Sequence, residues 1–139
     1  MEIKIYYEDT DCGGVVYYAN YFKYFERART EYLEVHGLSV PDLHQQGVIF
    51  VVTETHASFQ SPARYGEVLV IDTTISAPRR SVLTFSHRIR ERHSQRLIVQ
   101  GAASLVMTNG QGKVTRIPPK FLEALKVVQN SPPVSSGPT

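Results

Sequence analysis

The sequence predicts an α+β fold in which an antiparallel sheet wraps one long central helix, and three observations carry this prediction. From 18 to 36, apolar side chains recur at three- and four-residue steps and form a single stripe, as expected of a helix that packs on a sheet. Four later segments, at 48–59, 67–76, 81–92 and 97–108, have a period of two and are rich in Val, Ile, Thr and Phe. Their connections are short, and short connections join antiparallel neighbours.

Each earlier element has its own local signal. Residues 3–7 alternate and predict a first strand, which the glycine pair at 13–14 ends. Gly37 is a natural end for the long helix. The segment S-V-P-D that starts at Ser39 predicts the cap and acidic first turn of a short helix, which should end near Gly47.

The C-terminal part of the chain predicts one more short element. Two prolines precede 121–128, whose apolar residues share one side and predict an amphipathic piece. The tail at 130–139 has nothing substantial to bury, so we expect it to be flexible. One domain over 1–129 is therefore expected.

Composition narrows the classes of function. The chain has 139 residues, of which 42% are hydrophobic and 20% charged, as in ordinary soluble domains. Its net charge of +2 is too small to indicate nucleic-acid binding. The single cysteine, Cys12, excludes an internal disulfide and favours a reducing compartment, so we expect the cytoplasm. No leader pattern is found, and no apolar run approaches roughly 18 residues, so we expect no membrane span.

The most informative segment is 9–21, which is D-T-D-C-G-G-V-V-Y-Y-A-N-Y. It closes a strand with acids, turns on two glycines and opens the long helix, so a carboxylate is expected beside a helix amino end. That end offers free backbone N–H groups and a partial positive charge. A carboxylate that faces an oxyanion-stabilising amide suits cleavage of an ester or thioester. On spacing alone, an acid that merely caps the helix or the turn is an equal alternative.

Other residues near this segment have structural interpretations, and some also have a functional one. The glycine pair permits a close approach by substrate, but a tight turn explains it equally well. Asn20 is expected to hydrogen-bond the loop, and Glu26 to form a helix-surface ion pair with Arg29. Histidines show no metal-ligand spacing, so no metal is expected. Four tyrosines at the helix start would line a substrate slot or, more commonly, belong to the core: Tyr17, Tyr18, Tyr21 and Tyr24.

Several short motifs carry a resemblance to a known family. The most specific is Y-E-D-T-D-C-G-G-V-V-Y at 7–17, because acid, glycine, aromatic residue and helix start agree in spacing. The others are Tyr21, E-R-A-R-T-E at 26–31, F-V-V at 50–52, P-A-R at 62–64 and I-P-P at 117–119. On these residues the chain resembles the hotdog-fold acyl-CoA thioesterases, in the branch related to 4-hydroxybenzoyl-CoA thioesterase and the YbgC-like thioesterases.

The resemblance implies a hotdog fold, in which the sheet wraps the helix and two chains pair to extend it. It also implies an acyl-CoA substrate, hydrolysis by water without metal or cofactor, active sites at the subunit interface, and a homodimer or homotetramer. The family's acid falls on Asp11, as nucleophile or general base, and not on Asp9. The oxyanion donor falls on the backbone N–H of Tyr18.

Substrate-binding residues are expected from the same comparison. Gly14, Tyr17 and Tyr21 should border the thioester and the acyl group. Arg79 and Arg80 follow a turn beside the expected cleft, and guanidinium groups bind phosphates in a forked geometry, so they are candidates for CoA. A solvated strand face explains the two arginines about as well.

Departures from the family pattern keep alternatives open. Tyr18 stands where related chains often carry His, which leaves the acyl preference undecided. An enoyl-CoA hydratase or dehydratase would need a His paired with an acid near the central helix, and no His precedes His36. A non-catalytic acyl-CoA-binding hotdog protein is the other alternative, because a fold alone does not imply catalysis.

Overall fold

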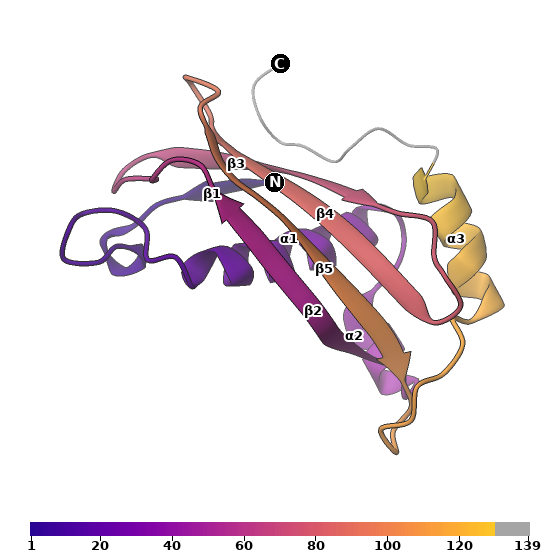
Figure 1. Ribbon diagram of the computed structural model, residues 1–139. Coiled ribbons are helices and arrows are strands. Elements are labelled where there is room, and N and C mark those ends of the chain that lie inside the picture. The colour runs from indigo at the N-terminus through magenta and orange to yellow at the C-terminus, as the bar shows by residue number, and fades with distance from the viewer. Residues whose placement is uncertain (130–139) are drawn as a thin grey trace.

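A computed structural model describes residues 1–129 of the chain. The helix α1 (Asn20–Val35) lies across one face of a single sheet, and α2 (Val40–Gln45) and α3 (Pro119–Gln129) lie at one end of it (Figure 1). The predicted α+β fold is therefore confirmed, whereas the tail at 130–139 lies outside the described residues. The sheet has five antiparallel strands in the order β1 (Glu2–Lys4), β3 (Val68–Ile75), β4 (Val82–Glu91), β5 (Leu97–Thr108) and β2 (Ile49–Phe59).

α1 packs on the sheet through the predicted apolar stripe. The inward-facing strand residues complete two core clusters, one beside the first half of the helix and one beside its second half. Burying a large apolar side chain stabilises a fold by about 1.5–3 kcal/mol, so this stripe dominates the attachment of α1. The buried helix residues are Tyr21, Tyr24, Phe25, Ala28, Tyr32 and Leu33.

At its middle, α1 approaches the sheet very closely. The ring of Phe25 stacks on the imidazole of His87 with 4.7 Å between ring centres. Gly101 makes this approach possible, because a Cβ at that position would lie 2.6 Å from two ring carbons of Phe25. His87 is 3% exposed, and its Nδ1 lies 3.1 Å from the Thr73 hydroxyl. The centre of the helix is thus fixed by packing.

Element ends differ from prediction at three places. The first strand stops at Lys4 instead of reaching residue 7, because the Asp9 carboxylate accepts the Tyr6 N–H at 2.9 Å and a 3₁₀ turn forms over Tyr7–Asp9. α1 begins at Asn20, two residues later than predicted, because the preceding residues form a turn. α3 begins at Pro119, where proline fits the first turn of a helix. The predicted cap Ser39 is confirmed.

β2 forms one edge of the sheet. It pairs with β5 on one side, and its other side has no strand partner within residues 1–129. Apolar side chains on this edge are partly exposed: Val51 is 43% exposed, Val52 44% and Phe59 49%. A long apolar edge of this kind favours pairing with another strand.

Candidate active site

The turn that carries Asp11 is fixed by its own hydrogen bonds. The Asp11 N–H donates to the Val15 carbonyl at 2.9 Å, and the Gly14 N–H donates to the Asp11 carbonyl at 3.1 Å. One carboxylate oxygen of Asp11 accepts the Gly13 N–H at 2.8 Å. Gly14 has φ +79°, a conformation that favours glycine. Asp11 therefore does stabilise the turn, while its exposed carboxylate still has a second oxygen for chemistry.

Tyr18 lies in the turn that leads into α1. The neighbouring N–H of Tyr17 donates to the Asp9 carbonyl at 3.0 Å, and the Tyr18 carbonyl accepts the Tyr21 N–H at 3.2 Å. Within residues 1–129, the Tyr18 N–H itself meets no protein acceptor. A free N–H at the start of a helix, where the helix dipole is positive, is suited to hold an oxyanion.

A cavity of about 320 Å³ opens beside Tyr18. Asp11 is not among its lining residues, but the turn that carries Asp11 continues directly into the wall residue Val16. The carboxylate and the cavity are therefore neighbours along the chain, and one chain alone does not enclose both. The cavity is lined by Val16, Tyr18, Tyr21, Phe59, Gln60, Ser61 and Pro62.

The other tyrosines predicted near the turn lie in different surroundings. Tyr17 is exposed and its ring centre lies 4.9 Å from that of Tyr18. Tyr21 is buried and still lines the cavity, and burial raises the pKa of its hydroxyl. Tyr24 belongs to the core. The side-chain amide of Asn20 donates to the Asp9 carbonyl at 2.9 Å, which confirms the predicted link between helix start and loop.

Arg79 and Arg80 are not brought to Asp11 within one chain. They form the exposed hairpin after β3, whereas the Asp11 turn pairs with Ala63 and Arg64, before the start of β3. β3 has eight residues, and at about 3.3 Å per residue the strand separates the two places by roughly 25 Å. A role for these arginines at the Tyr18 cavity therefore needs a second chain.

A second cavity, of about 370 Å³, lies between α1, α2 and the start of β2. Glu26 and Arg29 both line it, but the ion pair predicted between them is wrong: the ion pairs of the described residues do not include it. Glu26 instead accepts the Thr30 hydroxyl at 3.4 Å. Burial of the Arg29 guanidinium lowers its pKa, and the Glu26 carboxylate opposes this change.

Three residues of the wall of the Tyr18 cavity were not predicted from the sequence. Phe59 contacts Tyr18 edge-on with 6.2 Å between ring centres, and Gln60 and Ser61 complete the wall. The available signal was an aromatic residue that ends a predicted strand just before a proline turn.

Across 1–129, no group of three His, Cys, Asp or Glu side chains is placed to hold a metal ion. In that part of the chain, no helix combines the length and apolar character required to cross a membrane.

A sheet wrapped on one long helix, with an acid-glycine turn at the helix start, defines a hotdog-fold protein. Residues 6–125 match the Thioesterase-like superfamily, and the chain belongs to this family. A solved structure of a hypothetical protein from Thermus thermophilus has a TM-score of 0.86 at 33% identity and covers 92% of this chain and 97% of its own. A DHNA-CoA thioesterase from Staphylococcus aureus gives a TM-score of 0.87 at 28% identity over 93% and 89% of the two chains.

Curated relatives match over a shorter stretch. The acyl-CoA thioester hydrolase YbgC of Escherichia coli O6:H1 is 45% identical over 87 residues, which are 63% of this chain and 65% of the relative. In this match the chain spans slightly less than two thirds of the relative's length. A putative esterase of Aquifex aeolicus is 28% identical over 88% of this chain and 94% of its own. The family and the fold are thus shown.

Proposed function

We propose that this chain hydrolyses the thioester of an acyl-CoA to a carboxylic acid and free CoA. The observation that carries the proposal is the free N–H of Tyr18, a residue that lines a cavity whose wall continues, through Val16, into the turn that bears Asp11. Asp11 acts as nucleophile or general base, and the Tyr18 N–H stabilises the oxyanion. Membership of the Thioesterase-like superfamily and the names of the relatives above support the same activity.

Two routes balance the reaction. As nucleophile, Asp11 adds to the thioester carbonyl, the CoA thiolate leaves and takes up a proton, and water then hydrolyses the acyl–Asp11 anhydride. As general base, Asp11 takes a proton from water, the hydroxide adds to the carbonyl, and collapse of the tetrahedral species expels the same thiolate, which takes up the proton that Asp11 releases. Both routes place negative charge on the former carbonyl oxygen, where the Tyr18 N–H would stabilise it.

The test replaces the carboxylate without disturbing the turn. Asp11→Asn keeps the oxygen that accepts the Gly13 N–H but removes the charge, so we expect kcat to fall by about 10²–10⁴. Glu8→Gln, an exposed acid in the same loop, is the matched control and should keep full activity. A panel of acyl-CoA thioesters with a free-thiol readout measures both. Full activity of Asp11→Asn would remove Asp11 from the mechanism.

We also propose that the site is completed by a second copy of the chain. The free edge of β2, with Val51 and Val52 exposed, suits antiparallel pairing with the same strand across a two-fold axis. Such pairing would set the partner's β2 start, and the cavity beside its Glu26, against the Phe59 end of this chain. The mass of the protein in solution tests this: a monomer at micromolar concentration would contradict it, and a tetramer would require a further interface.

The same pairing gives Arg79 and Arg80 a role. Val82, just after the arginine hairpin, lies in one row with Val106 and Val51 across β4, β5 and β2. Across the two-fold axis, the partner's hairpin would therefore lie three strand spacings, roughly 14 Å, from the Phe59 end of this chain. That distance suits CoA phosphates whose thioester lies at Tyr18, and replacing both arginines by Gln should raise KM for the CoA ester more than it lowers kcat.

The alternative functions receive less support. None of the residues that line the Tyr18 cavity is a histidine, and the buried His87 stacks on Phe25, so a hydratase lacks its imidazole there. A protein that only binds acyl-CoA would bind the panel without releasing thiol, and that result would favour it.

A further inference from the structure

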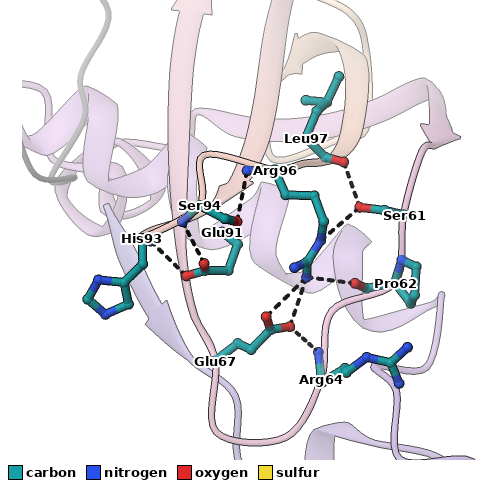
Figure 2. Close-up of polar contacts among 9 residues, drawn as sticks. All are labelled: Ser61, Pro62, Arg64, Glu67, Glu91, His93, Ser94, Arg96 and Leu97. Atoms are coloured by element: carbon teal, nitrogen blue, oxygen red, sulfur yellow. Dashed lines mark hydrogen bonds and ion pairs between the residues drawn. The ribbon is translucent and has the colours of Figure 1, made fainter.

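A carboxylate holds the hairpin between β4 and β5 in a defined shape. The Glu91 carboxylate accepts the N–H groups of His93 and Ser94, each at 2.8 Å (Figure 2). These two bonds lower the pKa of Glu91 to about 2. The Glu91 N–H also donates to the Arg96 carbonyl at 2.9 Å, which closes the hairpin. Arg96 therefore leaves the hairpin from a fixed position.

The Arg96 guanidinium reaches across to the loop at 61–67, which lies before β3. Its Nη2 donates to both carboxylate oxygens of Glu67, at 3.0 and 3.1 Å, and to the Pro62 carbonyl at 3.0 Å. Its Nε donates to the Ser61 hydroxyl at 3.3 Å, and that hydroxyl donates to the Leu97 carbonyl at 2.7 Å (Figure 2). One side chain thus ties both ends of the loop together.

This loop in turn supports the start of α1. The Ala63 carbonyl accepts the Val16 N–H at 2.8 Å, and Val15 forms an isolated bridge with Arg64. The Arg64 N–H donates to the Glu67 carboxylate at 2.7 Å, so the bridging segment is attached to the same carboxylate that Arg96 holds. Tyr18 follows Val16 by two residues.

We infer that Arg96, through its pairing with Glu67, is a positioning residue for the Tyr18 amide and its cavity. Two residues that the guanidinium contacts, Ser61 and Pro62, are themselves part of the cavity wall. The side chains of Arg96 and Glu67 are 38% and 23% exposed, so their pairing adds little to global stability. Its consequence is geometric, because charge-assisted hydrogen bonds from Nη2 and Nε hold the loop more firmly than neutral ones would.

The activity test rests on the proposed function. Arg96→Met should lower kcat for an acyl-CoA ester by roughly ten- to a hundredfold, because small displacements of an oxyanion donor have effects of this size. Tm should change little, since the core is untouched, and KM should change less than kcat, because only the Ser61–Pro62 part of the cavity wall loses its support. Arg96→Lys keeps the charge but has one nitrogen where Arg96 uses two, Nε and Nη2, to reach its partners. It should therefore recover only part of the lost kcat.

Arg90→Met is the matched control. It removes the ion pair between Arg90 and Asp72 at 2.7 Å, which joins β4 to β3, and the bond from Arg90 to Gln95 in the hairpin, but it does not touch the 61–67 loop. The variant therefore also controls for loosening of the hairpin itself. Its kcat should equal that of the wild type. Glu67→Gln combined with Arg96→Met should be no worse than the stronger single variant, because the two residues act as one unit.

Hydrogen exchange tests the clamp without any activity. In Arg96→Met, the hydrogen-bonded amides of Val16, Tyr17 and Glu67 should exchange faster than in the wild type, while those of β4 and β5 stay protected. Unchanged exchange at Val16, Tyr17 and Glu67, or equal loss of kcat in Arg90→Met, would overturn the inference. If the wild type hydrolyses no thioester, the proposed function fails, and the exchange result alone still decides whether Arg96 positions the turn.

Discussion

The start of α1 and its middle are held in different ways. In the middle, the Phe25 ring packs against Gly101 and stacks on His87, and both rings are buried. At the start, Asp11 and Tyr18 are exposed, and backbone hydrogen bonds to neighbouring loops fix the turn. A surface that must admit a substrate cannot be closed by packing, so hydrogen bonds take its place. Substitutions in the middle should therefore change stability, and substitutions at the start should change activity.

The largest stability effect is expected at Gly101. Gly101→Ala places a Cβ 2.6 Å from the Phe25 ring and 2.7 Å from the His56 carbonyl, so the helix must move away from the sheet. Overpacking of this kind lowers the free energy of unfolding by about 1–3 kcal/mol, which urea denaturation would measure. Activity per folded molecule should not change, because the Asp11 turn is remote from this contact.

Gly110 offers the control for this variant. A Cβ at Gly110 meets nothing within 4 Å, so Gly110→Ala should stay within about 0.5 kcal/mol of the wild type. Equal losses at both glycines would show that the close approach of Phe25 is not what limits this interface. A loss of activity in Gly101→Ala beyond the unfolded fraction would break the separation between the two regions.

The contrast also explains what the sequence could predict. The stripe on α1 and the positions of the strands follow from local patterns. Burial alternates along β4 as predicted, but not along the edge strand β2, whose side chains are exposed or only partly buried. The short turn over Tyr7–Asp9 was missed, since it depends on the Asp9 carboxylate reaching the Tyr6 N–H, and alternation gives no sign of that bond.

The site was only partly predictable for the same reason. The link from Asn20 to the loop was anticipated, because its partner lies near in sequence. Arg96 was not, because its partners Ser61 and Glu67 are 35 and 29 residues away and no local pattern links them. The ion pair expected between Glu26 and Arg29 is not formed. Helical spacing predicts which residues are neighbours, but it does not reveal that the Arg29 guanidinium is partly buried beside a cavity.

The pH dependence of the free energy of unfolding tests the buried packing around His87. Burial, assisted by the charge of Arg29, lowers the pKa of His87 from 6.5 to about 3. The unfolded chain therefore binds this proton first, and the free energy of unfolding falls as pH drops from about 6.5 toward 3. The slope reaches at most about 1.4 kcal/mol per pH unit. The variant His87→Gln should lose this contribution. Its free energy of unfolding, measured by urea denaturation, should therefore fall less between pH 6.5 and 5 than that of the wild type.

Glu91 does not obscure this measurement. Its pKa is lowered from 4.5 to about 2, so the stability that it contributes is present above pH 4.5 and is lost only below it. The window between pH 6.5 and 5 therefore reports on His87 when the two proteins are compared. Identical slopes for wild type and variant would mean that His87 accepts a proton in the folded state, and that the centre of the helix is less tightly packed than its geometry indicates.

The smallest effect is expected at Asn20, and it separates the two regions most directly. Asn20→Ala removes one hydrogen bond, from the side chain to the Asp9 carbonyl at 2.9 Å, and should cost about 1 kcal/mol. The Tyr17 N–H then holds that carbonyl alone, so the Tyr18 amide loses orientation and kcat should fall severalfold.

Asn109→Ala gives the matching loss at the other end of the sheet. The Asn109 side chain accepts the N–H groups of Gln111 and Lys113 at 2.9 and 3.1 Å, in the hairpin after β5, so its removal should cost a similar free energy of unfolding. Thioester turnover should stay at the wild-type level, because this hairpin is far from the Asp11 turn. If the two variants lose equal stability and only Asn20→Ala loses turnover, hydrogen bonds at the helix start serve orientation. If both lose turnover alike, general loosening of the fold accounts for the loss, and the helix start has no special role.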